Sequence, residues 1–285
     1  MDLRYYIEHP DDGKVMDIEY SVLGEFYNFN CPDGNTELHF RKSIEYGFDG
    51  LKADMRFTRD GEIVLCHDAG FTLDADGRIG RFDRGNFVAI RDMPLEEVLR
   101  LEFAAPFDGR RLHPCTLDTM LGLCRKHGKV AYLTLRPEPW REEVAKRMTE
   151  LIVKHDMQRQ TIVNLFPGCK EAMDSVEKLL PGLVYCNTRR NGDALTEELM
   201  DDSAEQGYKI LCLCHLMIDS VTREKCRYAA RKGLHVWTWD TMNAEDCAED
   251  LSRGITGFQM FSKDVTPAVI DGILAAQARE RAQFG

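Results

Sequence analysis

Short apolar runs alternate with amphipathic segments along most of the chain. The apolar runs have the length of buried strands and cover residues 20–23, 50–55, 130–135, 161–165, 183–186, 209–214, 234–239 and 257–261. Most are followed by segments in which apolar residues recur with the period of a helix, at 142–154, 170–180, 196–205, 220–232 and 244–253. Eight strands alternating with helices predict an α/β fold, the (β/α)8 TIM barrel.

The remaining segments fit around this barrel. Asn35 and Thr36 are candidate N-cap residues for a first helix, and Gly47 is a candidate terminator. The interval 69–115 is too long for a simple connection, so we expect an insertion after the second strand that overhangs the barrel mouth. The first eighteen residues and the tail from Ala275 are expected to be peripheral caps. We therefore predict one TIM-barrel domain over residues 1–285.

Composition narrows the classes of partner. The 285 residues are 44% hydrophobic and 30% charged, as in an ordinary globular protein. A net charge of −11 argues against broad binding of nucleic acid or of anionic membranes, although a local basic pocket remains compatible with it. The N-terminus has no apolar signal region, and no long uncharged apolar run occurs. We expect a cytoplasmic protein without an integral membrane segment; the sequence leaves its oligomeric state open.

Ten cysteines occur in the sequence. Cys212 and Cys214 share one face of a strand, and His215 follows them, which could suggest a metal site. No second cysteine pair lies at the spacing of a structural zinc site. Buried, reduced strand cysteines are the favoured interpretation, and we expect no metal and no cofactor.

The segment from Gly50 to Asp68 carries the clearest sign of chemistry. Residues two positions apart on a strand point the same way, so Lys52 and Asp54 share one face of an otherwise apolar strand. Burying a lysine beside an aspartate is costly unless they pair or act on a ligand. The pattern therefore predicts the floor of an active site.

In a TIM barrel the C-terminal ends of the strands converge on the site. The strand positions bring a set of polar and aromatic residues to this rim, namely Glu25, Lys52, Asp54, Arg56, His67, Thr134, Arg136, Trp237 and Trp239. Three cations beside a histidine suit a small anionic ligand, such as a phosphorylated compound.

Several motifs in this order resemble the glycerophosphodiester phosphodiesterase family. The resemblance rests on Gly34-Asn35-Thr36, Asp49 to Asp54, Thr58-Arg59-Asp60-Gly61 and His67-Asp68. Weaker matches follow at residues 113–117, 132–136 and 236–240, so the resemblance covers about residues 22–258. It implies a TIM barrel. Members of that family use two histidines as general acid and base, and a divalent metal held by three carboxylates.

The departures from the family pattern lie at the expected functional positions. Glu25 stands where the first histidine is expected, Lys52 at the first metal glutamate and Thr134 at the third metal ligand. Asp54 and His67 are retained. We therefore expect Lys52 to supply positive charge in place of the metal, which would make any activity metal-independent. The related bacterial phosphatidylinositol-specific phospholipases C, which use an arginine in an equivalent role, make this substitution chemically reasonable.

His67 is the best candidate for a general acid or base, because the unperturbed imidazole pKa lies near neutrality. A purely structural histidine is the alternative. Glu25 could act as the second proton-transfer group if burial raises its pKa, or it could only neutralise Lys52 or Arg136. Arg136 is expected to grip phosphate, with a rim salt bridge as the alternative.

The sequence leaves two orientations open for the two tryptophans near the end of the seventh predicted strand. Trp237 and Trp239 could pack against a ligand, or one of them could face the helical shell.

Three functions follow from these alternatives. The first is a divergent phosphodiesterase in which an internal hydroxyl of the substrate attacks phosphorus and releases a cyclic phosphate, since no protein nucleophile is evident. The second is an inactive protein that binds a phosphorylated ligand or a partner. The third is a lyase with Lys52 as a Schiff-base amine, although an adjacent aspartate keeps such an amine protonated.

Overall fold

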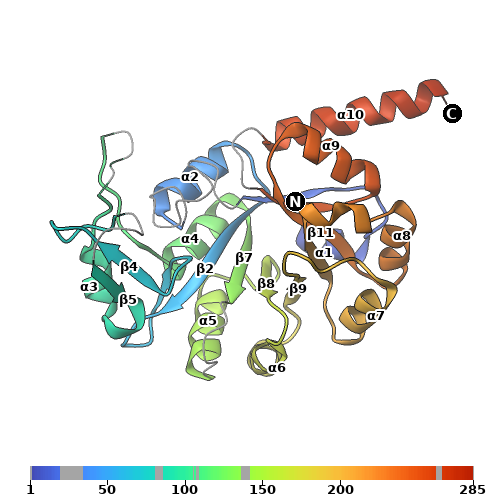
Figure 1. Cartoon of the computed structure of the whole chain (residues 1–285). Coiled ribbons are helices and arrows are strands. Elements are labelled where there is room, and N and C mark those ends of the chain that lie inside the picture. The colour runs from blue at the N-terminus through green and yellow to red at the C-terminus, as the bar shows by residue number, and fades with distance from the viewer. Residues whose placement is uncertain are drawn as a thin grey trace.

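The computed structural model describes residues 2–19, 35–80, 86–104, 106, 109–135, 142–260 and 265–284. Within these ranges, parallel strands close into a barrel with helices outside it (Figure 1). The barrel strands are β1 (Met16–Glu19), β2 (Gly50–Phe57), β7 (Val130–Leu135), β8 (Thr161–Leu165), β9 (Val184–Thr188), β10 (Ile210–Cys214), β11 (His235–Thr241) and β12 (Gly257–Met260). Closure comes from β1, which pairs in parallel with both β12 and β2. The predicted TIM barrel is confirmed.

Helices of the expected length follow most barrel strands. They are α2 (Glu37–Glu45), α4 (Leu117–His127), α5 (Glu142–Lys154), α6 (Lys170–Leu179), the 3-10 helix η2 (His215–Ser220), α7 (Glu197–Glu205), α8 (Arg223–Arg231), α9 (Ala244–Arg253) and α10 (Pro267–Phe284). A side-chain oxygen of the preceding residue accepts a backbone N–H at the start of several, as Thr36 does for α2 and Thr196 for α7. Gly47, with φ 93°, follows the end of α2 as predicted.

The interval between β2 and α4 builds a small additional layer. It contains β3 (Ile63–Leu65), β4 (Gly70–Leu73), β5 (Asn86–Ala89), the 3-10 helix η1 (Ile90–Asp92), α3 (Leu95–Arg100) and β6 (Cys115–Thr116). β3 pairs antiparallel with the last residues of β2, which places this layer beside the C-terminal end of that strand. In Figure 1 it lies at the opposite end of the molecule from α8 and α10. That it overhangs the barrel mouth stays a prediction.

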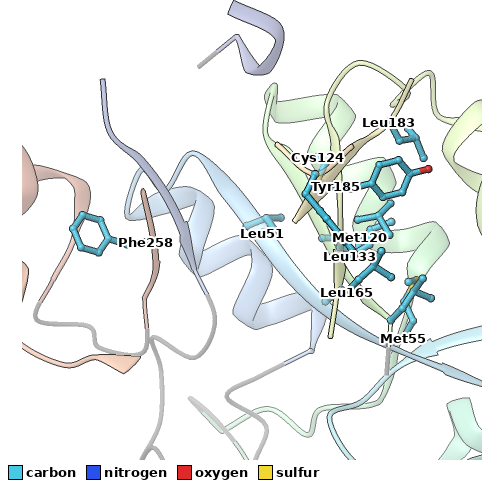
Figure 2. Packing of buried hydrophobic residues seen from close by; sticks show 14 of the residues in the cluster. Leu51, Met55, Met120, Cys124, Leu133, Leu165, Leu183, Tyr185 and Phe258 are labelled. Atoms are coloured by element: carbon cyan, nitrogen blue, oxygen red, sulfur yellow. The ribbon is translucent and has the colours of Figure 1, made fainter. Parts of the chain in front are cut away.

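Alternation along the strands divides the core into two parts. Leu51, Met55 and Leu133 belong to the outer cluster, which fills the space between the barrel and its helices (Figure 2). The residues that alternate with this outer set, such as Lys52, Asp54 and Tyr132, face the lumen. Its lower part is apolar and is closed by the N-terminal helix α1 (Leu3–Glu8), whose Tyr6 is completely buried there.

The first strand is the main correction to the sequence-based prediction. It was expected at residues 20–23, yet β1 is formed by Met16–Glu19, and residues 20–34 lie outside the described ranges. The expectation that the first eighteen residues form only a peripheral cap was therefore wrong. They supply both the plug at the bottom of the barrel and the strand that closes it, because Met16 and Ile18 alternate with polar residues and fill the lumen.

A buried histidine joins the plug to the barrel. His235 donates from Nε2 to the carbonyl oxygen of Tyr6 at 2.8 Å, and its ring stacks on the Tyr6 ring with centroids 4.0 Å apart. Burial lowers the pKa of His235 to about 4, because the imidazolium would be desolvated. The neutral ring is thus the form that fits between α1 and β11.

The sign of the resulting pH dependence follows from this lowered pKa. Stability from neutral His235 is complete above the unfolded-state pKa of about 6.5 and declines as the pH falls towards about 4. The full loss amounts to about 3 kcal/mol. His235→Gln keeps an amide donor but cannot titrate, so urea unfolding at pH 7, 6 and 5 should show a shallower decline than in the wild type. The exposed His127→Ala serves as the control. An unchanged slope in His235→Gln would contradict this assignment.

Candidate functional site

The lumen side of β2 carries a closed ion pair. Nζ of Lys52 lies 2.6 Å from Oδ2 of Asp54, and the side chains are 5% and 0% exposed. Leu51 and Met55 point the other way, into the outer core. The structure thus places both charges on the inner face, as strand parity predicts. Water is excluded from the pair, so each charge is stabilised chiefly by fixed protein partners.

Asn35 braces the aspartate from the segment before α2. Its Oδ1 accepts the backbone N–H of Asp54 at 2.9 Å, while its Nδ2 donates to Oδ2 of Asp54 at 3.4 Å. Asn35 adopts a left-handed backbone conformation with φ 57°, which asparagine tolerates better than most residues. The sequence marks Asn35 as a motif residue and a candidate N-cap, but its contact with Asp54 joins two separate segments and leaves no local pattern.

Arg56 organises the loop that carries the histidine. Its Nε donates to the carbonyl oxygen of Cys66 at 3.3 Å, and its Nη2 donates to the carbonyl oxygen of His67. Arg56 is buried as a residue, with an exposed fraction of 8%. Arg56 therefore fixes the position of His67, a role that the sequence did not indicate.

His67 is oriented by its neighbour in the sequence. Its Nδ1 lies 3.0 Å from Oδ1 of Asp68, and both side chains remain partly exposed, at 25% and 18%. With Nδ1–H donated to the carboxylate, Nε2 of the neutral ring carries the lone pair and can accept a proton. The arrangement can support acid–base chemistry at the site.

Thr134 lies next to Asp54 on the neighbouring strand β7. Its Oγ1 accepts a hydrogen bond from Nδ2 of Asn164 at 3.2 Å, and Oδ1 of Asn164 accepts from Oγ1 of Thr188 at 2.6 Å. These buried contacts were not foreseen, although Asn164 and Thr188 are polar residues in apolar strands. They form a chain of uncharged polar groups that begins beside Asp54.

Nearer the apolar lower part of the lumen lies a further group of uncharged polar side chains. The hydroxyl of Tyr132 accepts from Nε2 of Gln259 at 2.7 Å and contacts Sγ of Cys186 at 3.3 Å. Burial raises the pKa of Tyr132 and of Cys212 well above their ordinary values, so both stay protonated. Cys212 and Cys214 share one face, as expected, while His215 turns to Asp250 at 2.9 Å.

The two tryptophans lie one above the other on β11. Trp237 is completely buried in the lower apolar layer, where its Nε1 donates to the Tyr6 hydroxyl at 2.8 Å. Trp239 is half-buried nearer the C-terminal end of the strand, and its Nε1 donates to the carbonyl oxygen of Arg189. Neither tryptophan faces the helical shell, and Trp239 lies nearer the mouth.

Asp240 follows at a bulge between Trp239 and Thr241 and was not singled out from the sequence. It has a positive φ of 72°, which is uncommon outside glycine and occurs often at functional sites. Burial raises the pKa of its carboxyl. Glu25 and Arg136, both expected at the rim, lie outside the described residues.

Comparison with known proteins explains this arrangement of motifs. The profile of the glycerophosphoryl diester phosphodiesterase family matches residues 24–259. The chain belongs to this family. A glycerophosphodiester phosphodiesterase from Caldanaerobacter subterraneus subsp. tengcongensis is 23% identical over 245 residues, covering 80% of this chain and 88% of that protein.

Solved structures of the family share the fold. A phosphodiesterase from Oleispira antarctica, solved with its product sn-glycerol-3-phosphate, superposes with a TM-score of 0.70 at 17% identity, covering 91% of this chain and 96% of that one. The Thermotoga maritima glycerophosphodiester phosphodiesterase superposes with a TM-score of 0.63 at 19% identity, covering 92% and 98%.

The divalent metal of the family does not fit the residues described here. A hard cation needs several oxygen ligands, preferably carboxylates. Within the described ranges, the expected positions offer the carboxylate of Asp54, already paired with an ammonium, and the hydroxyl of Thr134. No cluster of three or more histidine, cysteine or acidic side chains suited to a metal occurs in those ranges. The donor set of the described residues therefore does not match a hard divalent cation.

The closed ion pair gives a direct stability prediction. Lys52→Met should leave the buried Asp54 carboxylate without its cation and lower the free energy of unfolding by about 3–5 kcal/mol. The matched control is Lys154→Met, which breaks an exposed pair with Asp118 and should lower it by about 1 kcal/mol at most. Chemical denaturation of both variants and the wild type measures the difference. Equal effects would show that the Lys52 pair contributes no more than a surface pair.

Proposed function

We propose that the protein is a divergent, metal-independent phosphodiesterase in which the Lys52 ammonium replaces the divalent metal. The observation that carries the proposal is the 2.6 Å contact between Lys52 and the retained Asp54 in the lumen. Phosphoryl transfer is accelerated by positive charge placed where charge builds up on the non-bridging oxygens. A buried ammonium in a water-poor site supplies such charge.

Each retained residue has a role in this proposal. Asp54, held by Asn35, fixes the ammonium, and Arg56 with Asp68 positions and orients His67. His67 would accept the proton from an attacking hydroxyl through Nε2. Glu25 remains the candidate that returns a proton to the leaving group, and Arg136 the candidate that grips the phosphate. Trp239 would form an apolar wall, with Trp237 supporting it from below.

The substrate class follows from the same chemistry. The Oleispira antarctica relative was solved with sn-glycerol-3-phosphate, so glycerophosphodiesters are the first compounds to test. An adjacent hydroxyl of the glycerol can attack phosphorus, forming one P–O bond while the bond to the leaving alcohol breaks. The product would be a cyclic phosphate, and no protein nucleophile is needed.

A non-catalytic role is the main rival. The ion pair joins the two charges inside the protein, and Asp54 is completely buried, which would also suit a filled, inactive site. Such a protein would bind a phosphorylated ligand without turnover. The Schiff-base lyase is disfavoured, because the same contact holds the Lys52 amine in its charged, non-nucleophilic form.

Activity on glycerophosphodiesters should survive strong chelation. We expect equal rates with and without EDTA, and cyclic phosphate visible by ³¹P NMR. His67→Gln should lower kcat by about 100-fold or more, since it removes the proton acceptor, whereas His127→Ala should not change it. Loss of activity in EDTA with recovery in Mg²⁺ would refute the metal-independent mechanism, and complete inactivity on a broad phosphodiester panel would favour the binding protein.

Restoring the missing carboxylates provides a second test. Asp54 and Thr134 are neighbours across β2 and β7, so Lys52→Glu combined with Thr134→Glu should gather three carboxylates and create a site for Mg²⁺ or Ca²⁺. Calorimetric titration should detect binding in the double variant and none in the wild type. The single variants serve as controls. A folded double variant that binds neither ion would show that the three positions do not converge.

A further inference from the structure

The N-terminal face of the barrel, opposite the candidate site, contains a groove of about 860 Å³. It lies between α8, the chain that follows α1 and the first residues of the last barrel strands. Figure 1 places α1 and α8 in the half of the molecule away from the insertion. Nothing in the proposed chemistry uses this groove.

Four basic side chains line the groove against two acidic ones. The basic residues are Lys209, Arg223, Arg227 and Arg231, and the acidic residues are Glu8 and Asp11. The groove therefore has an excess of two positive charges on a protein whose net charge is −11. Such a local reversal of sign concentrates anions.

Carboxylate partners, which many other cations of the protein have, are not found for these cations within the described ranges. Within the described ranges, no carboxylate forms an ion pair with Lys209, Arg227 or Arg231. Nε of Arg223 donates to the carbonyl oxygen of Ser252, and the Arg231 guanidinium lies 5.5 Å from the centre of the Tyr228 ring. Arg253, on the neighbouring helix, is paired with Glu249 at 2.8 Å. The groove cations thus remain available to an external anion.

Their spacing along α8 is unfavourable for the helix itself. Arg223, Arg227 and Arg231 follow one another at intervals of four residues, which brings like charges together on one helix face. Arg223 is also in the first turn, where the helix dipole disfavours a cation. An anion bound across this face would remove the repulsion, and each guanidinium can hold phosphate through two parallel hydrogen bonds.

We infer that this groove is a second binding site, specific for a soluble compound that carries a diphosphate or two phosphate groups. The excess of two positive charges matches a multiply charged anion. A concave site suits a small molecule, and the overall negative charge of the protein opposes adsorption to an anionic bilayer. The site is independent of the chemistry proposed at the barrel mouth.

Calorimetric titration of the full chain with inorganic pyrophosphate tests this inference. Arg227→Ala combined with Arg231→Ala should weaken binding by about tenfold or more, because each lost charge-assisted hydrogen bond contributes at least that factor. Both side chains are exposed, so the variant should fold. The matched control, Arg100→Ala with Arg125→Ala, removes the same charge from exposed sites elsewhere and should bind as the wild type does.

Three results would overturn the inference. They are the absence of pyrophosphate binding, equal binding by the wild type and the groove variant, and an equal loss in the control variant. The last would indicate a general effect of net charge. Co-sedimentation with phosphatidylglycerol vesicles tests whether the phosphate groups belong to lipid headgroups and not to a soluble compound. If vesicle binding requires the groove arginines while pyrophosphate does not bind, the groove recognises a membrane surface.

Discussion

The buried contact between Lys52 and Asp54 is the constraint around which the rest of the site is arranged. Two charges inside a barrel are tolerable only when each is held by the other and by further hydrogen bonds. The pair also fixes the register of β2, since a slip of one residue would move both charges into the apolar helix layer. Asn35 completes the arrangement by tying the aspartate to the start of α2.

Uncharged side chains lie near this pair within the described residues. Tyr132 and Cys212 stay protonated, and Thr134 is engaged by Asn164, so these three groups add no charge of their own. A divalent ion would offer two positive charges and open coordination positions, whereas an ammonium offers one charge and directed N–H donors. The chain keeps the family scaffold, and in the proposed mechanism the Lys52 ammonium takes the place of a bound metal.

The sequence alone predicts the structural features that depend on local periodicity. β7 and β8 coincide with the predicted runs because most of their residues are apolar, and strand parity places Lys52 on the same face as Asp54. The position of β1 was not predicted, because Met16 and Ile18 alternate with acidic residues and no apolar run marks the strand. The lumen contacts depend on residues brought together from different strands, and the role of Arg56 depends on how the chain after β3 folds back onto β2; no local pattern encodes either.

The way in which the barrel closes affects how the protein folds during its synthesis. β1 pairs with β12, so Met16 must meet Gly257, near the opposite end of the chain. Contacts of such long sequence separation form slowly, because the entropy of closing the intervening loop must be overcome first. During synthesis, the lumen stays open and its apolar lower layer unprotected until β12 has left the ribosome. Chaperone protection over that interval would then matter more for the yield of folded protein than the stability of any single helix.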